Sequence, residues 1–336
     1  MRNHSYSGVR VVVALSAALL SSLALSSGSG RATSDATMAS LAGRQTEATA
    51  LMARSLSSIK ALRHARGLPI DRELDPNQTG IIGEEFTPIT TSLGEVAAKR
   101  TSANPAFAGV LVRYLADAGL KPGDVVAIGA SGSFPALLLA TLSAARVLEL
   151  KPIVIYSVGA SMYGANLPGF TFVDMLAGLR ADGLLPYHIA AVSPGGENDT
   201  GTGVPFDEAG TALIAETRRT GLPLVEGASL AERIQWRLRA YETAAGGRPV
   251  RCFVNIGGAS ANFGDTPEAL ALPNGLLLKV ASVPASPTRG LIFEFTSRGI
   301  PVVHLLHVAG LARDNHLPYD PVPLAPIGRG GFVGRH

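Results

Sequence analysis

The chain is poor in cysteine and in charge. Cys252 is its only cysteine, so it can form neither an intramolecular disulfide nor a metal site built on clustered thiolates. That cysteine lies in an apolar run, which favours a buried thiol over a nucleophile. Charged residues make up 16% of the sequence, and the basic ones are scattered rather than clustered. Because nucleic-acid binding needs a basic patch, no nucleic-acid partner is predicted.

The chain also lacks the common nucleotide and metal motifs. The phosphate loop Gly-x4-Gly-Lys-Ser/Thr is absent, and the dinucleotide fingerprint Gly-x-Gly-x-x-Gly does not fit the glycine-rich turn at residues 129–133. The acidic segment 71–85 lacks the spacing of an EF-hand and is interpreted as a solvated loop. We therefore expect no cofactor and no metal. With 46% hydrophobic residues over 336 positions, the chain can bury a large core.

The most informative stretch covers residues 123–142. A β-branched apolar run ends at Gly129, a turn of small hydroxyl residues follows, and an apolar segment restarts at Pro135. Proline is favoured in the first turn of a helix and serine before it as the cap, so we predict a strand, a turn capped by Ser131 or Ser133, and a helix. Free amides in such a turn, next to the positive end of a helix, can hold a phosphate or a carboxylate.

Three interpretations of this turn remain open. It is an anion site, a hydrolase nucleophile elbow, or a capped connection without a ligand. The elbow motif Gly-x-Ser-x-Gly is matched imperfectly, because Ser133 stands where its last glycine belongs. Polar turns without ligands are common in α/β domains.

Three further segments resemble the first: residues 151–161, 251–260 and 300–307 are each apolar and of strand length. Continuous apolar strands separated by helices indicate a parallel sheet buried on both faces. We predict an α/β fold with a mostly parallel sheet and helices on both faces. It is preceded by an N-terminal hydrophobic segment and a long amphipathic helix.

Glycine, serine and asparagine follow three of these strands. In open α/β sheets ligands bind outside the carboxyl ends of the strands, so these residues are expected to share one rim. The alternative is that they merely ease tight connections. The candidate ligand-binding residues are Gly129, Gly132, Ser157, Ser161, Asn166, Asn255, Gly257 and Gly258.

A catalytic set is a further hypothesis. Ser131 or Ser133 would be the nucleophile, His304 the base and Asp199 the acid that orients it, with His307 as a weaker substitute for the base. Asp199 belongs to the glycine-rich loop 193–203, which is either a surface loop or a lid. A single histidine in an apolar strand is more often a hydrogen-bonded core residue.

The start of the chain indicates export. Arg2, His4 and Arg10 precede an apolar segment over residues 11–25, which is typical of a cleaved signal or a retained anchor. The basic residues predict that this end faces the cytoplasm and that the body lies outside it. Residues 37–65 then show helical periodicity, and this helix is either a stalk that docks a partner or packs on its own domain.

The predicted organisation has four parts. Residues 1–30 are a signal peptide or membrane anchor, residues 31–66 an amphipathic helical stalk, residues 67–325 a single α/β domain and residues 326–336 a flexible tail.

Several of these blocks together resemble the family called poly-gamma-glutamate system protein. The most specific of them is the run Ser131-Gly132-Ser133-Phe134-Pro135-Ala136-Leu137. The others are Asp75-Pro76-Asn77 to Gly80, Gly83-Glu84, Asn104-Pro105, Ser157 to Ser161 with Gly164-Ala165-Asn166, Gly195-Gly196 with Asp199, Asn255-Ile256-Gly257-Gly258 and Pro301 through His304-Leu305-Leu306.

The resemblance implies an accessory role in making, exporting or retaining poly-γ-glutamate at the outer face of the cytoplasmic membrane. Its implied partners are the synthase subunits and the anionic polymer, with the N-terminal segment as the membrane contact. It implies no catalytic residue. The alternative function is a serine-dependent hydrolase or transferase that acts on γ-glutamyl amide bonds, and the two differ in whether Ser131 or Ser133 lies within reach of a base.

Overall fold

In a computed structural model, residues 40–205, 207, 208 and 210–325 are described. The hydrophobic segment 11–25 and the tail 326–336 lie outside these residues. The chain divides into two units, residues 1–43 and residues 44–336. Residues 40–43 of the first are helical, and everything below concerns the second. Over the described part of the chain, no helix combines the length and hydropathy needed to cross a bilayer.

The second unit is built on a six-stranded sheet with the order β5-β3-β2-β6-β8-β7. Its strands are β2 (Val125–Ser131), β3 (Lys151–Ser157), β5 (Ile189–Ser193), β6 (Val250–Ile256), β7 (Gly275–Leu277) and β8 (Val302–Leu305). All pair in parallel except β7 with β8. The mixed α/β fold with a mostly parallel sheet is therefore confirmed. All seven residues of β2 are buried, as expected for a central strand covered on both faces.

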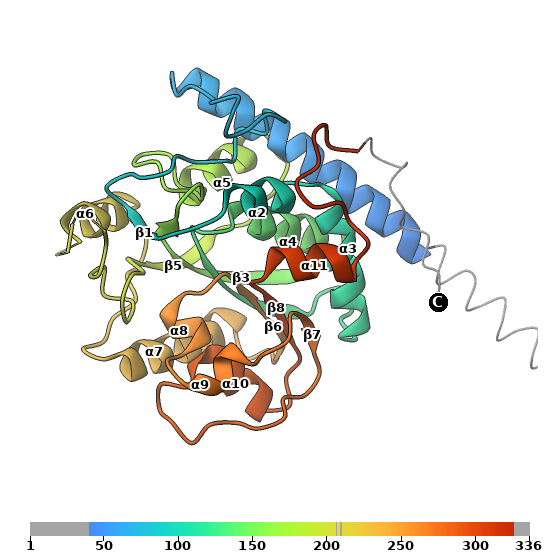
Figure 1. The fold of residues 1–336 in the computed structure, drawn as a ribbon. Helices are drawn as coiled ribbons and strands as arrows, with labels where there is room; N and C mark the ends of the chain where they lie inside the picture. The colour runs from blue at the N-terminus through green and yellow to red at the C-terminus, as the bar shows by residue number, and fades with distance from the viewer. Residues whose placement is uncertain (1–39, 206, 209, 326–336) are drawn as a thin grey trace, which may run out of the picture. The chain divides into compact units, whose positions relative to one another are not determined.

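Two groups of helices cover the sheet on opposite faces (Figure 1). One group contains α2 (Val96–Ser102), α3 (Ala106–Asp117), α4 (Pro135–Val147) and α11 (Val308–Asp314). The other contains α7 (Leu230–Ala245), α8 (Ser260–Phe263) and α10 (Gly290–Ser297). The remaining elements are α5 (Phe172–Ala181), α6 (Thr211–Arg219), α9 (Pro267–Leu270) and a two-stranded sheet of β1 (Thr90–Ser92) with β4 (Ala160–Ser161).

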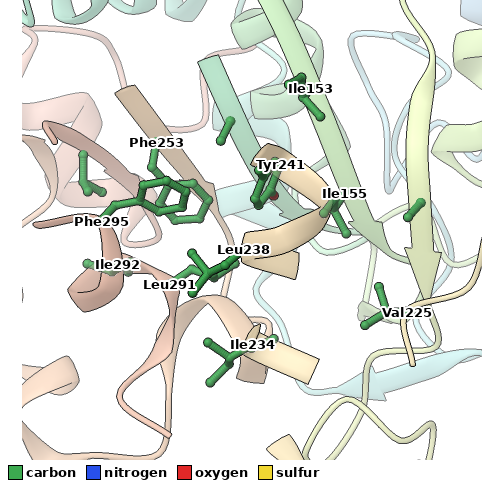
Figure 2. Packing of buried hydrophobic residues seen from close by; sticks show 14 of the residues in the cluster. Ile153, Ile155, Val225, Ile234, Leu238, Tyr241, Phe253, Leu291, Ile292 and Phe295 are labelled. Atoms are coloured by element: carbon green, nitrogen blue, oxygen red, sulfur yellow. The ribbon is translucent and has the colours of Figure 1, made fainter. Parts of the chain in front are cut away.

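The core on the α7 and α10 face is apolar and aromatic (Figure 2). Phe253 of β6 stacks on Phe295 of α10 with ring centroids 4.7 Å apart. The Tyr241 hydroxyl, which is also buried there, donates to the Ile128 carbonyl oxygen at 2.8 Å. Because this hydrogen bond satisfies the hydroxyl, the tyrosine can pack in an apolar layer.

The helical residues 44–65 pack against the rest of this unit. Ala48, Met52 and Ile59 are fully buried along one face, and the Gln45 side-chain amide donates to the Gly109 carbonyl oxygen at 3.2 Å. An apolar stripe at helical spacing is the usual means by which a surface helix is held. Packing on its own domain was one of the two alternatives for this segment.

Candidate functional site

The strand order places a crevice between β2 and β6. From β2 the chain runs to β3 and then β5 on one side, and it returns to place β6 on the other side of β2. The connections after β2 and β6 thus leave toward opposite faces, and this is where open parallel sheets bind ligands. A cavity of about 470 Å³ lies here, lined by residues of both connections together with α2, β4 and the start of α11.

Serines end three neighbouring strands in register. Ser131 pairs with Ser157, and Ser157 pairs with Ser193. Ser131, Ser133, Ser157, Ser161 and Gly258 all line the cavity. Part of the rim predicted from the sequence thus borders this cavity, whereas Asn255 and Gly257 are not among the residues that line it.

The predicted cap of α4 is wrong. The cap position is Phe134, and no side chain accepts a hydrogen bond there. The Ser131 hydroxyl accepts from the Ser133 amide at 3.4 Å, two residues before the helix begins at Pro135. The Ser133 hydroxyl accepts from the Ser161 amide at 3.0 Å, so it ties the turn to β4 instead of closing the helix.

Lys99 of α2 is the cation of this cavity. Its side chain is 3% exposed, and its ammonium donates to Ser161 Oγ at 2.7 Å and to the Ser133 carbonyl oxygen at 2.6 Å. The same nitrogen lies 3.7 Å from the centre of the Phe134 ring, a cation–π contact. No carboxylate in the described ranges forms an ion pair with it. Burial lowers the pKa of Lys99 to about 7.

Asp199 belongs to a separate cluster of buried side chains at the ends of β3 and β5. It pairs with Arg237 of α7 at 2.6 Å, and both side chains are fully buried. Ser193 donates to Asp199 at 2.6 Å, and Arg237 donates to Ser193 at 2.6 Å and to Ser157 at 3.2 Å. This cluster anchors the loop 193–203 to the sheet through Asp199, whose backbone has a φ of 65°.

His304 of β8 lies opposite Asn255 of β6. The Asn255 amide nitrogen is 2.9 Å from His304 Nδ1 and also donates to the Gly257 carbonyl oxygen at 2.9 Å. The imidazole stacks on Phe263, with ring centres 6.0 Å apart. Burial lowers the pKa of His304 to about 4, so the ring is neutral at neutral pH.

The proposed catalytic set is therefore distributed over three places. Neither Ser131 nor Ser133 is hydrogen-bonded to His304. Asp199 is hydrogen-bonded to Arg237, Ser157 and Ser193 rather than to the imidazole. His307 lines the cavity, and its side chain is exposed to solvent.

The other candidate ligand residues have structural contacts. Asn166 is fully buried and bridges the Glu84 backbone and the Thr90 hydroxyl. Gly129 faces the Asn262 side chain, where an added Cβ would approach within 2.5 Å. Gly257, at φ 81°, leaves room for the Ser131 hydroxyl in the same way.

Sequence reasoning missed Lys99. It stands in an ordinary helical stretch beside Arg100, and nothing in that pattern separates a buried lysine from a solvated one. No group of three or more His, Cys, Asp and Glu side chains in the part of the chain described here is arranged to hold a metal ion. No protein-family model, curated protein or solved structure matches this chain.

Proposed function

We propose that this protein binds the anionic polymer poly-γ-glutamate and acts as an accessory protein in its biosynthesis, export or retention. The proposed location is the outer face of the cytoplasmic membrane, with the synthase subunits as partners and the segment 11–25 as the membrane contact. The resemblance of the sequence blocks to the poly-gamma-glutamate system protein family supports the polymer and the partners. The cavity at the carboxyl edge of the sheet supports the binding of an anion.

The observation that carries the proposal is the buried ammonium of Lys99, which has no counter-ion among the residues that the structure describes. Removing a charge from water is unfavourable unless a partner compensates it, and the lowered pKa of Lys99 reflects that cost. A carboxylate that enters the cavity would supply the missing partner. Binding should then raise the pKa of Lys99 and draw in a proton at mildly alkaline pH.

The cavity volume limits what can enter. About 470 Å³ is within the range of small-ligand sites and holds a short piece of polymer, not a long tract. One or two γ-linked glutamate units, each with a free α-carboxylate, are compatible with that volume and with the cation at its wall.

Binding of labelled γ-linked glutamate oligomers, followed by fluorescence anisotropy, tests the proposal. We expect Lys99→Met to weaken binding by about tenfold or more, equivalent to ~1.4 kcal/mol. Lys99→Arg, which keeps the charge, should retain most of the affinity. Lys151→Gln is the matched control, because Lys151 is exposed at the opposite end of β3. Equal binding by Lys99→Met and the wild type would overturn the proposal, as would equal affinity for α-linked oligomers.

A second function is favoured by one contact. The hydroxyl of Ser161 lies 2.7 Å from a lysine amine whose pKa is near neutrality, an arrangement that suits a serine-dependent hydrolase or transferase acting on γ-glutamyl amide bonds. Shortening of poly-γ-glutamate on incubation with the purified protein would support it. Unchanged polymer length, with binding intact, would leave only the accessory role.

A further inference from the structure

We propose that Ser161 is a nucleophile and Lys99 its general base, and that together they transfer an acyl group from an amide or ester carbonyl bound in the cavity. The choice of a γ-glutamyl acyl group rests on the proposed function. The pairing of Ser161 with Lys99 does not, because it follows from the geometry alone.

The amine is held in one orientation by two contacts besides Ser161. One is the hydrogen bond to the Ser133 carbonyl oxygen and the other is the face of the Phe134 ring. A neutral lysine amine keeps two N–H groups and one lone pair. It can therefore continue to donate to Ser133 while the lone pair accepts the proton of the Ser161 hydroxyl. A carboxylate paired with the amine would keep it charged. Of the titratable groups that line the same cavity, Glu95, His307 and Tyr319, none forms an ion pair with Lys99 in the ranges described.

The nucleophile is equally well placed. Ser161 ends β4, and its amide donates to Ser133 Oγ at 3.0 Å, which fixes the backbone that carries it. Its side chain lines the cavity. Gly94 lies beside it, and a Cβ there would come within 3.1 Å of the Ser161 hydroxyl oxygen. A side chain at position 94 would therefore crowd the Ser161 hydroxyl.

The chemistry balances without any further reagent except water. Ser161 Oγ forms a bond to the carbonyl carbon while its proton passes to Lys99 Nζ. The carbon–nitrogen or carbon–oxygen bond then breaks, and the leaving amine or alcohol takes that proton from Lys99. Water, deprotonated by the same amine, attacks the resulting ester and releases the acid and the free serine. A second amine in place of water would give transfer instead of hydrolysis.

A fluorophosphonate probe tests the pair in the full chain without knowledge of the substrate. Attack by an activated serine forms a phosphorus–oxygen bond and expels fluoride, and peptide mass mapping locates the label. We expect the label on Ser161, at a rate that rises with pH through a midpoint near 7. No label on Ser161 under conditions that label a serine hydrolase added to the same tube would overturn the proposal, and this measurement needs no variant.

Variants distinguish a Lys99 that acts as general base from a Lys99 whose charge only binds the ligand. Ser161→Ala should abolish labelling, and both Lys99→Met and Lys99→Arg should lower the rate by about a hundredfold or more, since arginine cannot accept a proton. Ser297→Ala, at an exposed serine of α10, should label as the wild type does. Unchanged labelling in Lys99→Arg would overturn the role of Lys99. Labelling without binding of γ-linked oligomers would refute the proposed polymer alone, and binding without labelling would refute the nucleophile alone.

Discussion

Arg237 and Asp199 form an ion pair of 2.6 Å in which both side chains are fully buried. The pair is not isolated, because Ser157 and Ser193, at the ends of β3 and β5, donate hydrogen bonds to Asp199 and accept them from Arg237. Two nitrogens of the guanidinium, Nε and Nη1, still have no partner among the residues described. The stability of this cluster therefore depends on the match between one cation and one anion.

Removing one partner should destabilise the protein more than removing both. Asp199→Leu leaves the Arg237 charge buried and uncompensated, at a cost of about 3–5 kcal/mol. Arg237→Met combined with Asp199→Leu removes both charges of the pair, and we expect the double variant to be more stable than Asp199→Leu alone. Urea unfolding monitored by circular dichroism measures the difference.

The control for this experiment is the exposed pair of Arg298 with Glu242, at 3.1 Å. Glu242→Ala should cost less than about 1 kcal/mol, as loss of an exposed ion pair generally does, and it leaves the contact of Arg298 with Glu294 in place. A double variant less stable than Asp199→Leu alone would show that the hydrogen bonds to the serines, not charge compensation, dominate the cluster.

Lys99 should make the stability of the protein depend on pH in the alkaline range. Its pKa is about 7 in the folded chain and near 10.5 in the unfolded one, so between these values the unfolded state binds more protons. Stability should therefore rise as the pH rises from about 7 toward 10, by at most about 1.4 kcal/mol per pH unit. Below about pH 7 both states are protonated and the penalty is fully present.

Lys99→Met removes this titration. The variant should be more stable than the wild type near pH 7, and its lead should shrink as the pH rises. Urea midpoints measured at pH 7, 8 and 9 test this, with Lys151→Gln as the control for loss of an exposed positive charge. Parallel pH profiles of Lys99→Met and the wild type would contradict the assignment of the low pKa.

Gly132 is expected to tolerate no side chain. An added Cβ would lie 2.7 Å from the Val158 carbonyl oxygen and 2.8 Å from the Ala160 Cβ, both in the segment that runs from β3 into β4. Gly132→Ala should cost about 1–3 kcal/mol through overpacking and should also displace Ser131 and Ser133. Gly258→Ala is the matched control, because its Cβ would meet only Leu306 at an ordinary 3.7 Å. Thermal unfolding of both variants measures the contrast.

The parallel sheet could be predicted because its strands are almost wholly apolar. Residues 125–128 and 252–254 are apolar and form buried strands, and such runs have few alternatives in a folded domain. Strand β5 was not predicted, since Ile189–Ser193 is short and rich in alanine. The antiparallel β7 has only three residues and carries no periodic signal.

The site was predictable at the level of its rim but not of its side-chain chemistry. Glycine and serine after an apolar strand indicate a turn at the carboxyl edge, and Ser131 and Ser157 do lie side by side there. The burial of Lys99 depends on how α2 meets the turn before α4, a relation between segments that no local pattern encodes. The partners of His304 and Asp199 are likewise set by tertiary packing, which brought them to Asn255 and Arg237.

The order of the strands also has a consequence for the order of folding. Before β6 joins the sheet, β2 can pair with β3 and β3 with β5, but the other edge of β2 must wait for β6. Until then that edge offers unpaired backbone groups to other chains, and the cavity has only one of its walls. Assembly of the site is thus a late event in folding, because the cavity also needs residues that follow β6 and β8 in the chain.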